Sequence, residues 1–200
     1  LQVEPRTPLV GIVSRMADQK GWDLIIPLLE HWVESRDVQR AILGTGDPVY
    51  EAQLRRLADL AQRRLGLRLE FSEQMAHRIE AACDMFLMPS RYEPCGLNQL
   101  YSLKYGSVPI VHSTGGLADT VRDATPANLH NRTANGFRFD DYSLVGLERA
   151  VNKAVDVYMH NQPQWNQIVE SGMRDDWSWE QSAKHYMEIY ERTVNSDLSS

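Results

Sequence analysis

Residues 84–111, DMFLMPSRYEPCGLNQLYSLKYGSVPIV, decide the fold. An apolar run of strand length at 84–88 is followed by a proline-containing loop, a helical stretch at 97–105 and a second strand-length run at 108–111. Neither apolar run alternates regularly with polar residues, which is typical of strands covered on both faces. A strand, a helix and a strand in this order predict one right-handed unit of a parallel sheet.

The same alternation continues on both sides of this unit, so we expect an α/β domain of three layers, with a mostly parallel sheet of about six strands and a helical C-terminus. A proline at position 27 falls inside the first expected helix, where it removes a hydrogen bond and favours a kink. The expected strands are 9–13, 39–43, 67–71, 84–88, 108–111 and a weaker 136–139, and the expected helices are 22–35, 49–65, 74–82, 97–105, 117–122, 143–160, 164–173 and 178–194.

Composition excludes several classes of protein. The 200 residues are 42% hydrophobic and 24% charged, which is ordinary for a globular domain with one core. A net charge of -6 argues against nucleic-acid binding, and no apolar run approaches the roughly 20 residues that a membrane span needs. The first eight residues do not resemble a signal peptide. Two cysteines are too few for a disulfide framework, which favours a reducing compartment.

Ligands of open parallel sheets bind beyond the carboxyl ends of the strands, so the loops after the strands are the candidate sites. Arg15 and Lys20 share the loop after the first strand, where two cations could bind a diphosphate. An Arg/Lys pair at such spacing is more often a surface pair without a ligand. The Gly44-Thr45-Gly46 turn lacks the third glycine of a dinucleotide site and is a tight turn.

The loop after the fourth strand carries the strongest signal. Gly96 allows a ligand to approach the backbone closely, and the helix that starts at Leu97 presents free amides to an anion. Glu93 would repel phosphate, so its carboxylate fits sugar hydroxyls or a positively charged transition state better. A carboxylate that caps the helix is the alternative.

Other reactive residue types point to no site of their own. Cys95 has no neighbouring histidine in the sequence to activate it as a nucleophile. Gly115-Gly116 after the fifth strand is either a second close backbone approach or a plain turn. The six histidines lack metal-binding spacing and no acidic cluster suggests Mg²⁺, so no metal and no cofactor are expected.

Four loops together resemble one family. The strings are SRMADQKGWD at 14–23, GTGDP at 44–48, SRYEPCGLNQL at 90–100 and TGGLADTV at 114–121, and they occur in family order. They resemble the C-terminal domain of bacterial glycogen synthases and of plant or cyanobacterial starch synthases. The resemblance covers about residues 8–194, and EPCGL is its most specific string.

The resemblance implies one half of a GT-B glycosyltransferase, in which two Rossmann-like domains close over a nucleotide-sugar. The implied reaction transfers glucose from ADP-glucose to the nonreducing 4-hydroxyl of an α-1,4-glucan, with retention and without a metal. A non-catalytic nucleotide- or glucan-binding module and a UDP-sugar-dependent transferase are the alternatives. The implied location is the cytoplasm, with the plastid stroma as the alternative.

The resemblance also implies roles for single residues. Arg15 and Lys20 match the family's pair on the diphosphate, and Glu93 matches its essential glutamate. By the same resemblance, the phosphates would be met by the backbone amides of Gly96, Leu97 and Asn98. The donor sugar would lie near Cys95, Gly115 and Gly116.

Two further residues match the nucleotide end of the family's site. Phe71 stands where relatives often carry a tyrosine that stacks on adenine, although a phenylalanine at a strand end is usually part of the core. Tyr101 replaces a glutamate that holds ribose in many relatives, and this fits ADP-glucose better than UDP-sugars.

The family's N-terminal domain, with its Lys-x-Gly-Gly-Leu signature and acceptor groove, has no counterpart in this sequence. We therefore expect one domain over 1–194, a disordered tail at 195–200, and no transferase activity from this domain alone. Trp179, Tyr186 and Tyr190 form a stripe on the last expected helix. The stripe is expected to pack on this domain's own sheet, and the alternative is that the helix crosses to the other domain.

Overall fold

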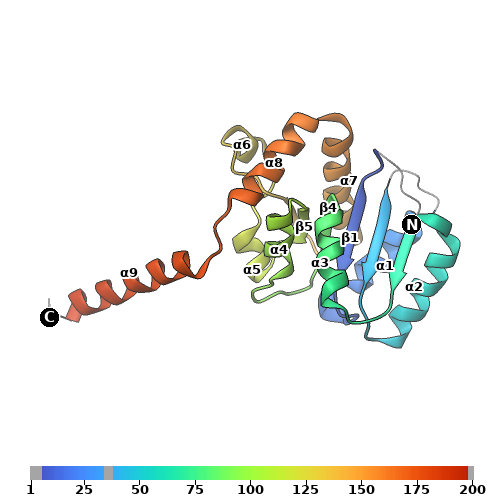
Figure 1. Cartoon of the computed structure of the whole chain (residues 1–200), viewed down its shortest axis with the longest axis horizontal. Coiled ribbons are helices and arrows are strands. Elements are labelled where there is room, and N and C mark those ends of the chain that lie inside the picture. The colour runs from blue at the N-terminus through green and yellow to red at the C-terminus, as the bar shows by residue number, and fades with distance from the viewer. Residues whose placement is uncertain (1–5, 34–37, 198–200) are drawn as a thin grey trace.

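The computed structural model describes residues 6–33 and 38–197. Within these ranges six parallel strands form one sheet, as predicted (Figure 1). Their order in the sheet is β3-β2-β1-β4-β5-β6. The strands are β1 (Leu9–Val13), β2 (Gln39–Leu43), β3 (Leu65–Arg68), β4 (Met85–Met88), β5 (Val108–His112) and β6 (Phe137–Phe139).

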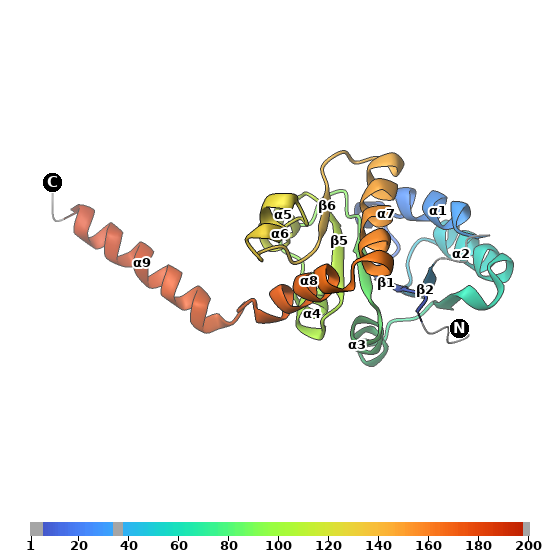
Figure 2. The ribbon, with the colours of Figure 1, turned by 90° about the horizontal axis from the view of Figure 1, so that it is seen from above.

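Helices cover both faces of the sheet (Figures 1 and 2). On one face lie α1 (Trp22–His31), α2 (Pro48–Leu60) and α7 (Leu144–His160), and on the other lie α3 (Glu73–Ala82) and α4 (Asn98–Tyr105). α8 (Gln162–Arg174) packs against α4 and α7. The remaining helical elements are short α5 (Gly115–Thr120), α6 (Pro126–His130), the 3-10 turns η1 (Asp18–Lys20) and η2 (Gln62–Arg64), and α9 (Trp179–Asp197).

The core forms between the sheet and the α1, α2 and α7 layer. Val10 and Ile12 of β1 are buried, as the absence of polar alternation predicted. Leu147, Val151 and Ala154 recur at three- and four-residue spacing on α7 and are fully buried against the strands. Such burial removes a Leu or Val side chain from water at a gain of about 1.5–3 kcal/mol each, and this layer therefore fixes the sheet beneath the site.

The third strand lies two residues earlier than predicted. It spans Leu65–Arg68 instead of 67–71, and its parallel register with β2 ends at the pair Leu43–Arg68. Beyond that pair the chain has no partner strand to bond with. Phe71 therefore lies in the following loop with 84% of its surface exposed, so the alternative that it is part of the core is wrong.

Most predicted helices are present with shifted ends. The second helix ends at Leu60 instead of 65, because a 3-10 turn and the start of β3 take the next residues. α1 runs unbroken through Pro27, which lies past its first turn, and ends at His31. The predicted end at 35 falls outside the described residues. α6 was not predicted, although Thr125 caps it and Pro126 starts it.

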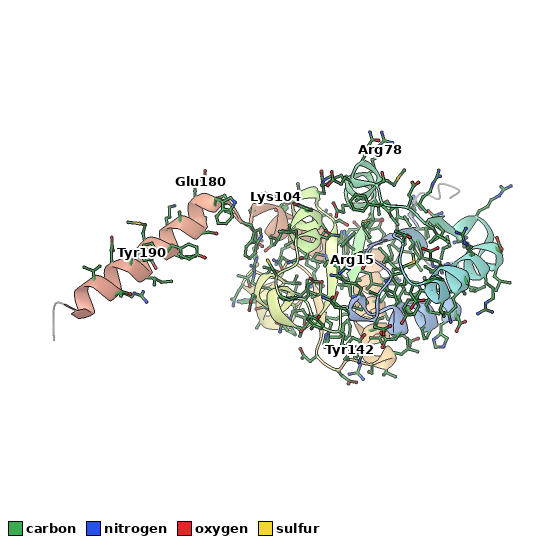
Figure 3. The ribbon with its side chains drawn as sticks, turned by 90° about the horizontal axis from the view of Figure 1, so that it is seen from below. Arg15, Arg78, Lys104, Tyr142, Glu180 and Tyr190 are labelled. Carbon is green, nitrogen blue, oxygen red and sulfur yellow. The ribbon has the colours of Figure 1, made fainter. Side chains whose placement is uncertain are left out.

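The last helix does not pack on the sheet. α9 projects away from the domain (Figures 1–3), and the side chains of Trp179, Tyr186 and Tyr190 are 83%, 56% and 60% exposed. The expectation that this stripe packs on the domain's own sheet is therefore wrong, because α8 already covers the adjoining face. The predicted tail was also misplaced in part, since 195–197 continue α9, whereas 198–200 lie outside the described residues.

No helix in the described ranges combines the length and apolarity needed to cross a membrane.

The strand order reverses between β1 and β4. The chain builds β1, β2 and β3 outward in one direction and then returns through α3 to place β4 on the other side of β1. Loops that leave the carboxyl ends of β1 and β4 diverge at such a point and leave a crevice between them. The crevice contains the loops on which Arg15, Lys20 and Glu93 were predicted to lie.

Candidate functional site

A cavity of about 420 Å³ opens at the carboxyl ends of β1, β2 and β4. It brings together most of the residues that the sequence indicated, from the segments that follow β1, β3 and β4. Those that line it are Arg15, Lys20, Phe71, Glu93, Gly96, Leu97, Asn98 and Tyr101. Cys95, Gly115 and Gly116 are not among its lining residues.

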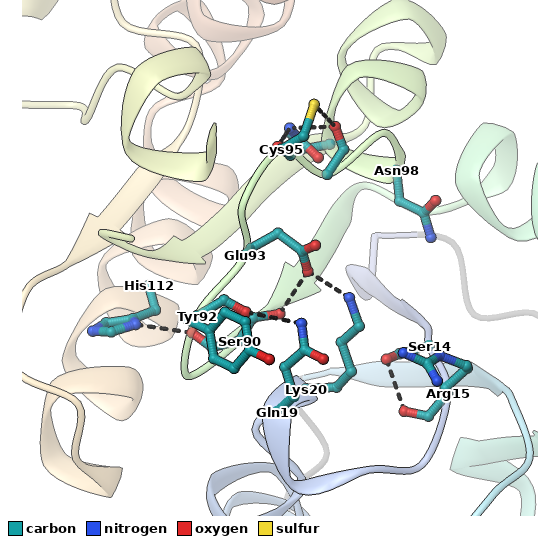
Figure 4. A network of polar contacts seen from close by, with 12 residues as sticks. Ser14, Arg15, Gln19, Lys20, Ser90, Tyr92, Glu93, Cys95, Asn98 and His112 are labelled. Atoms are coloured by element: carbon teal, nitrogen blue, oxygen red, sulfur yellow. Dashed lines mark hydrogen bonds and ion pairs between the residues drawn. The ribbon is translucent and has the colours of Figure 1, made fainter. Parts of the chain in front are cut away.

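Lys20 and Glu93 are in direct contact at the centre of the cavity. The Lys20 Nζ lies 2.5 Å from Glu93 Oε2, although the two residues are 73 positions apart (Figure 4). The carboxylate side chain is 9% exposed and the lysine side chain 20% exposed. A carboxylate at this depth is costly unless it is paired, and Lys20 supplies that partner.

Ser90 also bonds to the Glu93 oxygen that Lys20 contacts. Ser90 Oγ donates to Glu93 Oε2 at 3.2 Å, and Ser90 itself is 2% exposed. The Ser90 carbonyl accepts from His112 Nδ1 at 2.8 Å (Figure 4). This bond fixes the proton on Nδ1 and ties the Glu93 loop to the end of β5.

The loops that carry Lys20 and Glu93 are also joined by their backbones. The Arg91 amide donates to the Gln19 carbonyl at 2.9 Å, and Gln19 Nε2 donates to the Tyr92 carbonyl at 3.3 Å. Because both bonds run between the β1 and β4 loops, one backbone bond and one side-chain bond hold the lysine and the glutamate in register.

Arg15 supplies a second positive charge to the same cavity. Arg15 is exposed, and no hydrogen bond or ion pair of its guanidinium is found in the described ranges. Its carbonyl accepts from Trp22 Nε1 at 2.8 Å, which anchors the backbone from which the side chain extends. The guanidinium is therefore available to an anion, whereas Lys20 is already shared with Glu93.

The turn before α4 offers amides to the same space. The amides of Leu97 and Asn98 have no hydrogen-bond partner within the described residues, and Leu97 caps α4 without a side-chain bond. Gly96 reaches this geometry with a φ of +74°, which favours glycine. The fully buried Gln99 holds the turn, because its Nε2 donates to the carbonyls of Cys95 and Gly96 at 3.0 and 3.1 Å. Free amides at the helix N-terminus attract anions.

The glycine pair of α5 packs on the Glu93 turn instead of lining the cavity. A Cβ on Gly115 would lie 2.2 Å from the Glu93 carbonyl oxygen, and one on Gly116 would lie 2.0 Å from that of Cys95. The Gly116 amide donates to the Glu93 carbonyl at 3.0 Å. Of the two interpretations of this glycine pair, a close backbone approach and a plain turn, the structure shows the close approach. The glycines approach the backbone of Glu93 and Cys95.

The far end of the cavity is formed by α3, its preceding loop and α4. Phe71 and Tyr101 line it, as the sequence indicated. His77 and Glu80 line it too, and sequence reasoning missed them. Their three-residue spacing on α3 was the available signal, since it places both on the side that faces α4.

No group of three or more His, Cys, Asp or Glu side chains suited to a metal ion occurs in residues 6–33 and 38–197. The positive charges of the cavity come from Arg15 and Lys20.

Comparisons with known proteins give consistent matches over most of the chain. The sequence model of the family described as "Glycosyl transferases group 1" matches residues 2–172. The glycogen synthase of Rhodopirellula baltica is 50% identical over 196 residues, which are 98% of this chain and 39% of that protein. The glycogen synthase of Hydrogenovibrio crunogenus is 45% identical over 192 residues, 96% of this chain and 39% of that protein. The chain thus spans about two fifths of the length of these relatives.

Solved structures show the same fold. The catalytic domain of starch synthase IV from Arabidopsis thaliana, bound to ADP and acarbose, has a TM-score of 0.85 and 34% identity, and the match covers 98% of this chain and 40% of that one. Sucrose-phosphate synthase from Thermosynechococcus elongatus has a TM-score of 0.66 at 18% identity over 96% of this chain and 47% of that one, which supports the fold alone. These matches confirm the resemblance that the four motifs indicated.

Proposed function

The chain belongs to the group 1 family of glycosyl transferases, and on that premise we propose that it is the donor-binding domain of a glycogen or starch synthase. The proposed reaction transfers glucose from ADP-glucose to the nonreducing 4-hydroxyl of an α-1,4-glucan with retention of configuration. The observation that carries the proposal is the 2.5 Å contact between Lys20 and Glu93, in a cavity that also holds Arg15 and free helix amides.

The diphosphate would bind at the Arg15 side of the cavity. A guanidinium suits phosphate because it offers several donors in a fixed plane. Lys20 and the amides of Leu97 and Asn98 add further donors to the same space. Together these groups would neutralise the charge that builds on ADP as it leaves, which is the task a divalent metal performs elsewhere, so we propose transfer without a metal.

Glu93 would face the glucose of the donor. When the bond to ADP breaks, positive charge develops at the anomeric carbon, and a fixed carboxylate stabilises it. The Ser90 hydroxyl and the His112–Ser90 bond keep the carboxylate from turning away when Lys20 shifts toward phosphate. Cys95, Gly115 and Gly116 would shape this region indirectly, since the glycines fix the backbone on which Glu93 stands.

The adenine would bind at the far end, against Phe71. Its ring is exposed and lines the cavity, and a free aromatic ring on a loop suits stacking on a base. Support for adenine comes from starch synthase IV, which was solved with ADP. Tyr101 would border the ribose.

The acceptor would be bound by the part of the longer protein that the relatives possess and this chain does not span. α9, which leaves its stripe of Trp179, Tyr186 and Tyr190 exposed, fits the alternative interpretation that it crosses to that part. We therefore expect the chain to bind ADP without transferring glucose. The relatives are bacterial, which favours the cytoplasm over a plastid stroma as the location.

Calorimetric titration of this chain with ADP and with UDP tests the donor assignment. We expect ADP to bind more tightly than UDP, and Arg15→Ala and Lys20→Ala each to weaken ADP binding by about tenfold, since a hydrogen bond to a charged group contributes about 1.5–3 kcal/mol. Arg174→Ala, which removes an exposed arginine of α8, is the matched control and should bind as the wild type does. No ADP binding at millimolar concentration would refute the proposal.

The catalytic assignment is tested on the longer protein. In a protein that spans the full length of the glycogen synthase relatives, Glu93→Ala should abolish glucosyl transfer. Circular dichroism should show that this variant remains folded. Unchanged transfer would instead favour a non-catalytic binding module.

A further inference from the structure

His77 and Glu80 form a polar pair inside the cavity. The His77 Nδ1 lies 3.3 Å from Glu80 Oε2, one helical turn along α3. The glutamate side chain is 1% exposed, and its Oε2 has no hydrogen-bond partner in the described ranges apart from this approach of the imidazole. Burial raises the pKa of Glu80, as expected for a carboxyl with so few donors around it.

The imidazole is held in place by α4. The His77 and Tyr101 rings meet in a T-shaped arrangement with centroids 5.5 Å apart, and the Tyr105 ring lies at 6.0 Å from that of His77. The Tyr105 hydroxyl is 3.4 Å from Nδ1. The polar contacts of the imidazole, with Glu80 and Tyr105, both involve Nδ1, and within the described residues no hydrogen bond of Nε2 is found.

The free Nε2 suits a hydroxyl in particular. With Glu80 ionised, Nδ1 carries the proton and Nε2 accepts a hydrogen bond; with Glu80 protonated, the carboxyl donates to Nδ1 and Nε2 carries the proton instead. A hydroxyl both donates and accepts, so it bonds to Nε2 in either state. The pair therefore offers one fixed hydroxyl-binding atom, half-exposed at the cavity wall.

The position of this atom in the cavity corresponds to a sugar ring. Tyr101, which His77 touches, stands one helical turn after the free amides of Leu97 and Asn98. Phe71 lies just before the start of α3. A nucleoside diphosphate with its phosphates at those amides and its base at Phe71 would place its ribose between the two ends, and His77 and Tyr101 line the same cavity.

We propose that His77 binds a ribose hydroxyl of the nucleoside diphosphate through Nε2, and that Glu80 is a positioning residue that orients the imidazole. This inference rests on the proposed function, because it takes the donor's nucleotide as the occupant of the cavity.

The test compares ribose with deoxyribose ligands. The wild-type chain is titrated with ADP, 2′-deoxy-ADP and 3′-deoxy-ADP by calorimetry. We expect ADP to bind about fivefold more tightly than at least one deoxy analogue, which is the usual net value of one hydrogen bond. His77→Ala should weaken ADP by the same factor and leave that analogue unchanged. His160→Ala, which removes an exposed histidine paired with Asp156 on α7, should leave the ratio intact.

Three further variants separate binding from packing. His77→Phe keeps an aromatic ring against Tyr101 but has no Nε2, so it should lose the preference for ribose as His77→Ala does. Glu80→Gln keeps an acceptor oxygen beside Nδ1 and should retain the preference, whereas Glu80→Ala should reduce it. Equal weakening of ADP and both deoxy analogues by His77→Phe would overturn this inference alone. Failure of the wild-type chain to bind ADP would overturn the proposed function with it.

Discussion

Glu93→Gln is expected to make the chain bind ADP more tightly, although it replaces the residue proposed to act in catalysis. Without ligand, Lys20 donates to Glu93 at 2.5 Å, so a diphosphate has to compete with the carboxylate for the same ammonium group. The carboxylate also repels the phosphates. A neutral amide removes both obstacles and nearly preserves the size of the side chain. ADP carries no glucose, so it isolates this effect from contacts between Glu93 and the sugar.

The expected gain follows from the burial of the pair. A hydrogen bond between charged groups contributes about 1.5–3 kcal/mol net. One fifth of the Lys20 side chain is exposed, so water and the incoming phosphate compensate part of its loss. We therefore take the cost of releasing Lys20 as about 1 kcal/mol, which corresponds to about fivefold in the dissociation constant.

Isothermal titration of wild type and Glu93→Gln with ADP measures this difference directly. Glu30→Gln is the matched control, because it also removes one negative charge from an ion pair 2.5 Å long, with Arg56, but does so outside the cavity. We expect its affinity for ADP to equal that of the wild type. ADP binding by Glu93→Gln that is equal to or weaker than wild type would show that Lys20 is not shared between carboxylate and phosphate.

Other variants test the surroundings of the site. Gly116→Ala places a Cβ 2.0 Å from the Cys95 carbonyl oxygen and should cost about 3 kcal/mol in urea unfolding; an unchanged midpoint would contradict the close packing. Phe71→Ala should leave stability within about 0.5 kcal/mol but weaken ADP binding about tenfold, and the reverse pattern would return Phe71 to the core. Burial raises the pKa of Glu80, so the folded chain holds this proton to higher pH than the unfolded chain, and the free energy of unfolding falls as pH rises above 4.5. Glu80→Gln should lessen that fall, as measured by urea unfolding between acidic and neutral pH. An equal fall in the variant and the wild type would refute this account of Glu80. Burial also raises the pKa of Cys83 to about 12, so iodoacetamide at mildly alkaline pH should modify exposed Cys95 alone in the native chain, as mass spectrometry would detect.

The strands of the sheet could be predicted because burial on both faces leaves a direct trace in sequence. β1 and β5 are continuous apolar runs and lie within a residue of their predicted limits. The run LRLEF at 67–71 carries the same pattern, but β3 stops at Arg68, where its partner β2 ends. Pairing with a neighbouring strand decided that boundary, and the sequence of the strand alone does not contain it.

The two charged loops of the site could be predicted for a topological reason. In a parallel sheet the loops after all strands leave from the same edge, and because β1 and β4 are neighbours their loops meet. Strand order therefore brings Arg15, Lys20 and Glu93 together, rather than proximity in sequence. His77 and Glu80 were missed because two polar residues one turn apart on a helix usually mark its solvent side. α3 packs on β1, β2 and α4, and the sequence of the helix alone does not show that these contacts bury Glu80.

The last helix illustrates the opposite case. Its tyrosines and tryptophan repeat at helical spacing, and this pattern correctly predicts a helix with an apolar face. The pattern does not identify what covers that face. In the fold, the side of the sheet next to α9 is covered by α8, which packs against β5 and α4. Amphipathic periodicity fixes the element, whereas its partner depends on the rest of the chain.

The seating of Gly115 and Gly116 against the carbonyls of Glu93 and Cys95 limits how this domain can diversify. Two main-chain segments from neighbouring loops interlock there with no side chain between them, so neither can be reshaped without the other. A change of sugar preference in a descendant of this protein would have to come from the outer rim of the cavity, where side chains are free to vary, and not from the loop that carries the carboxylate.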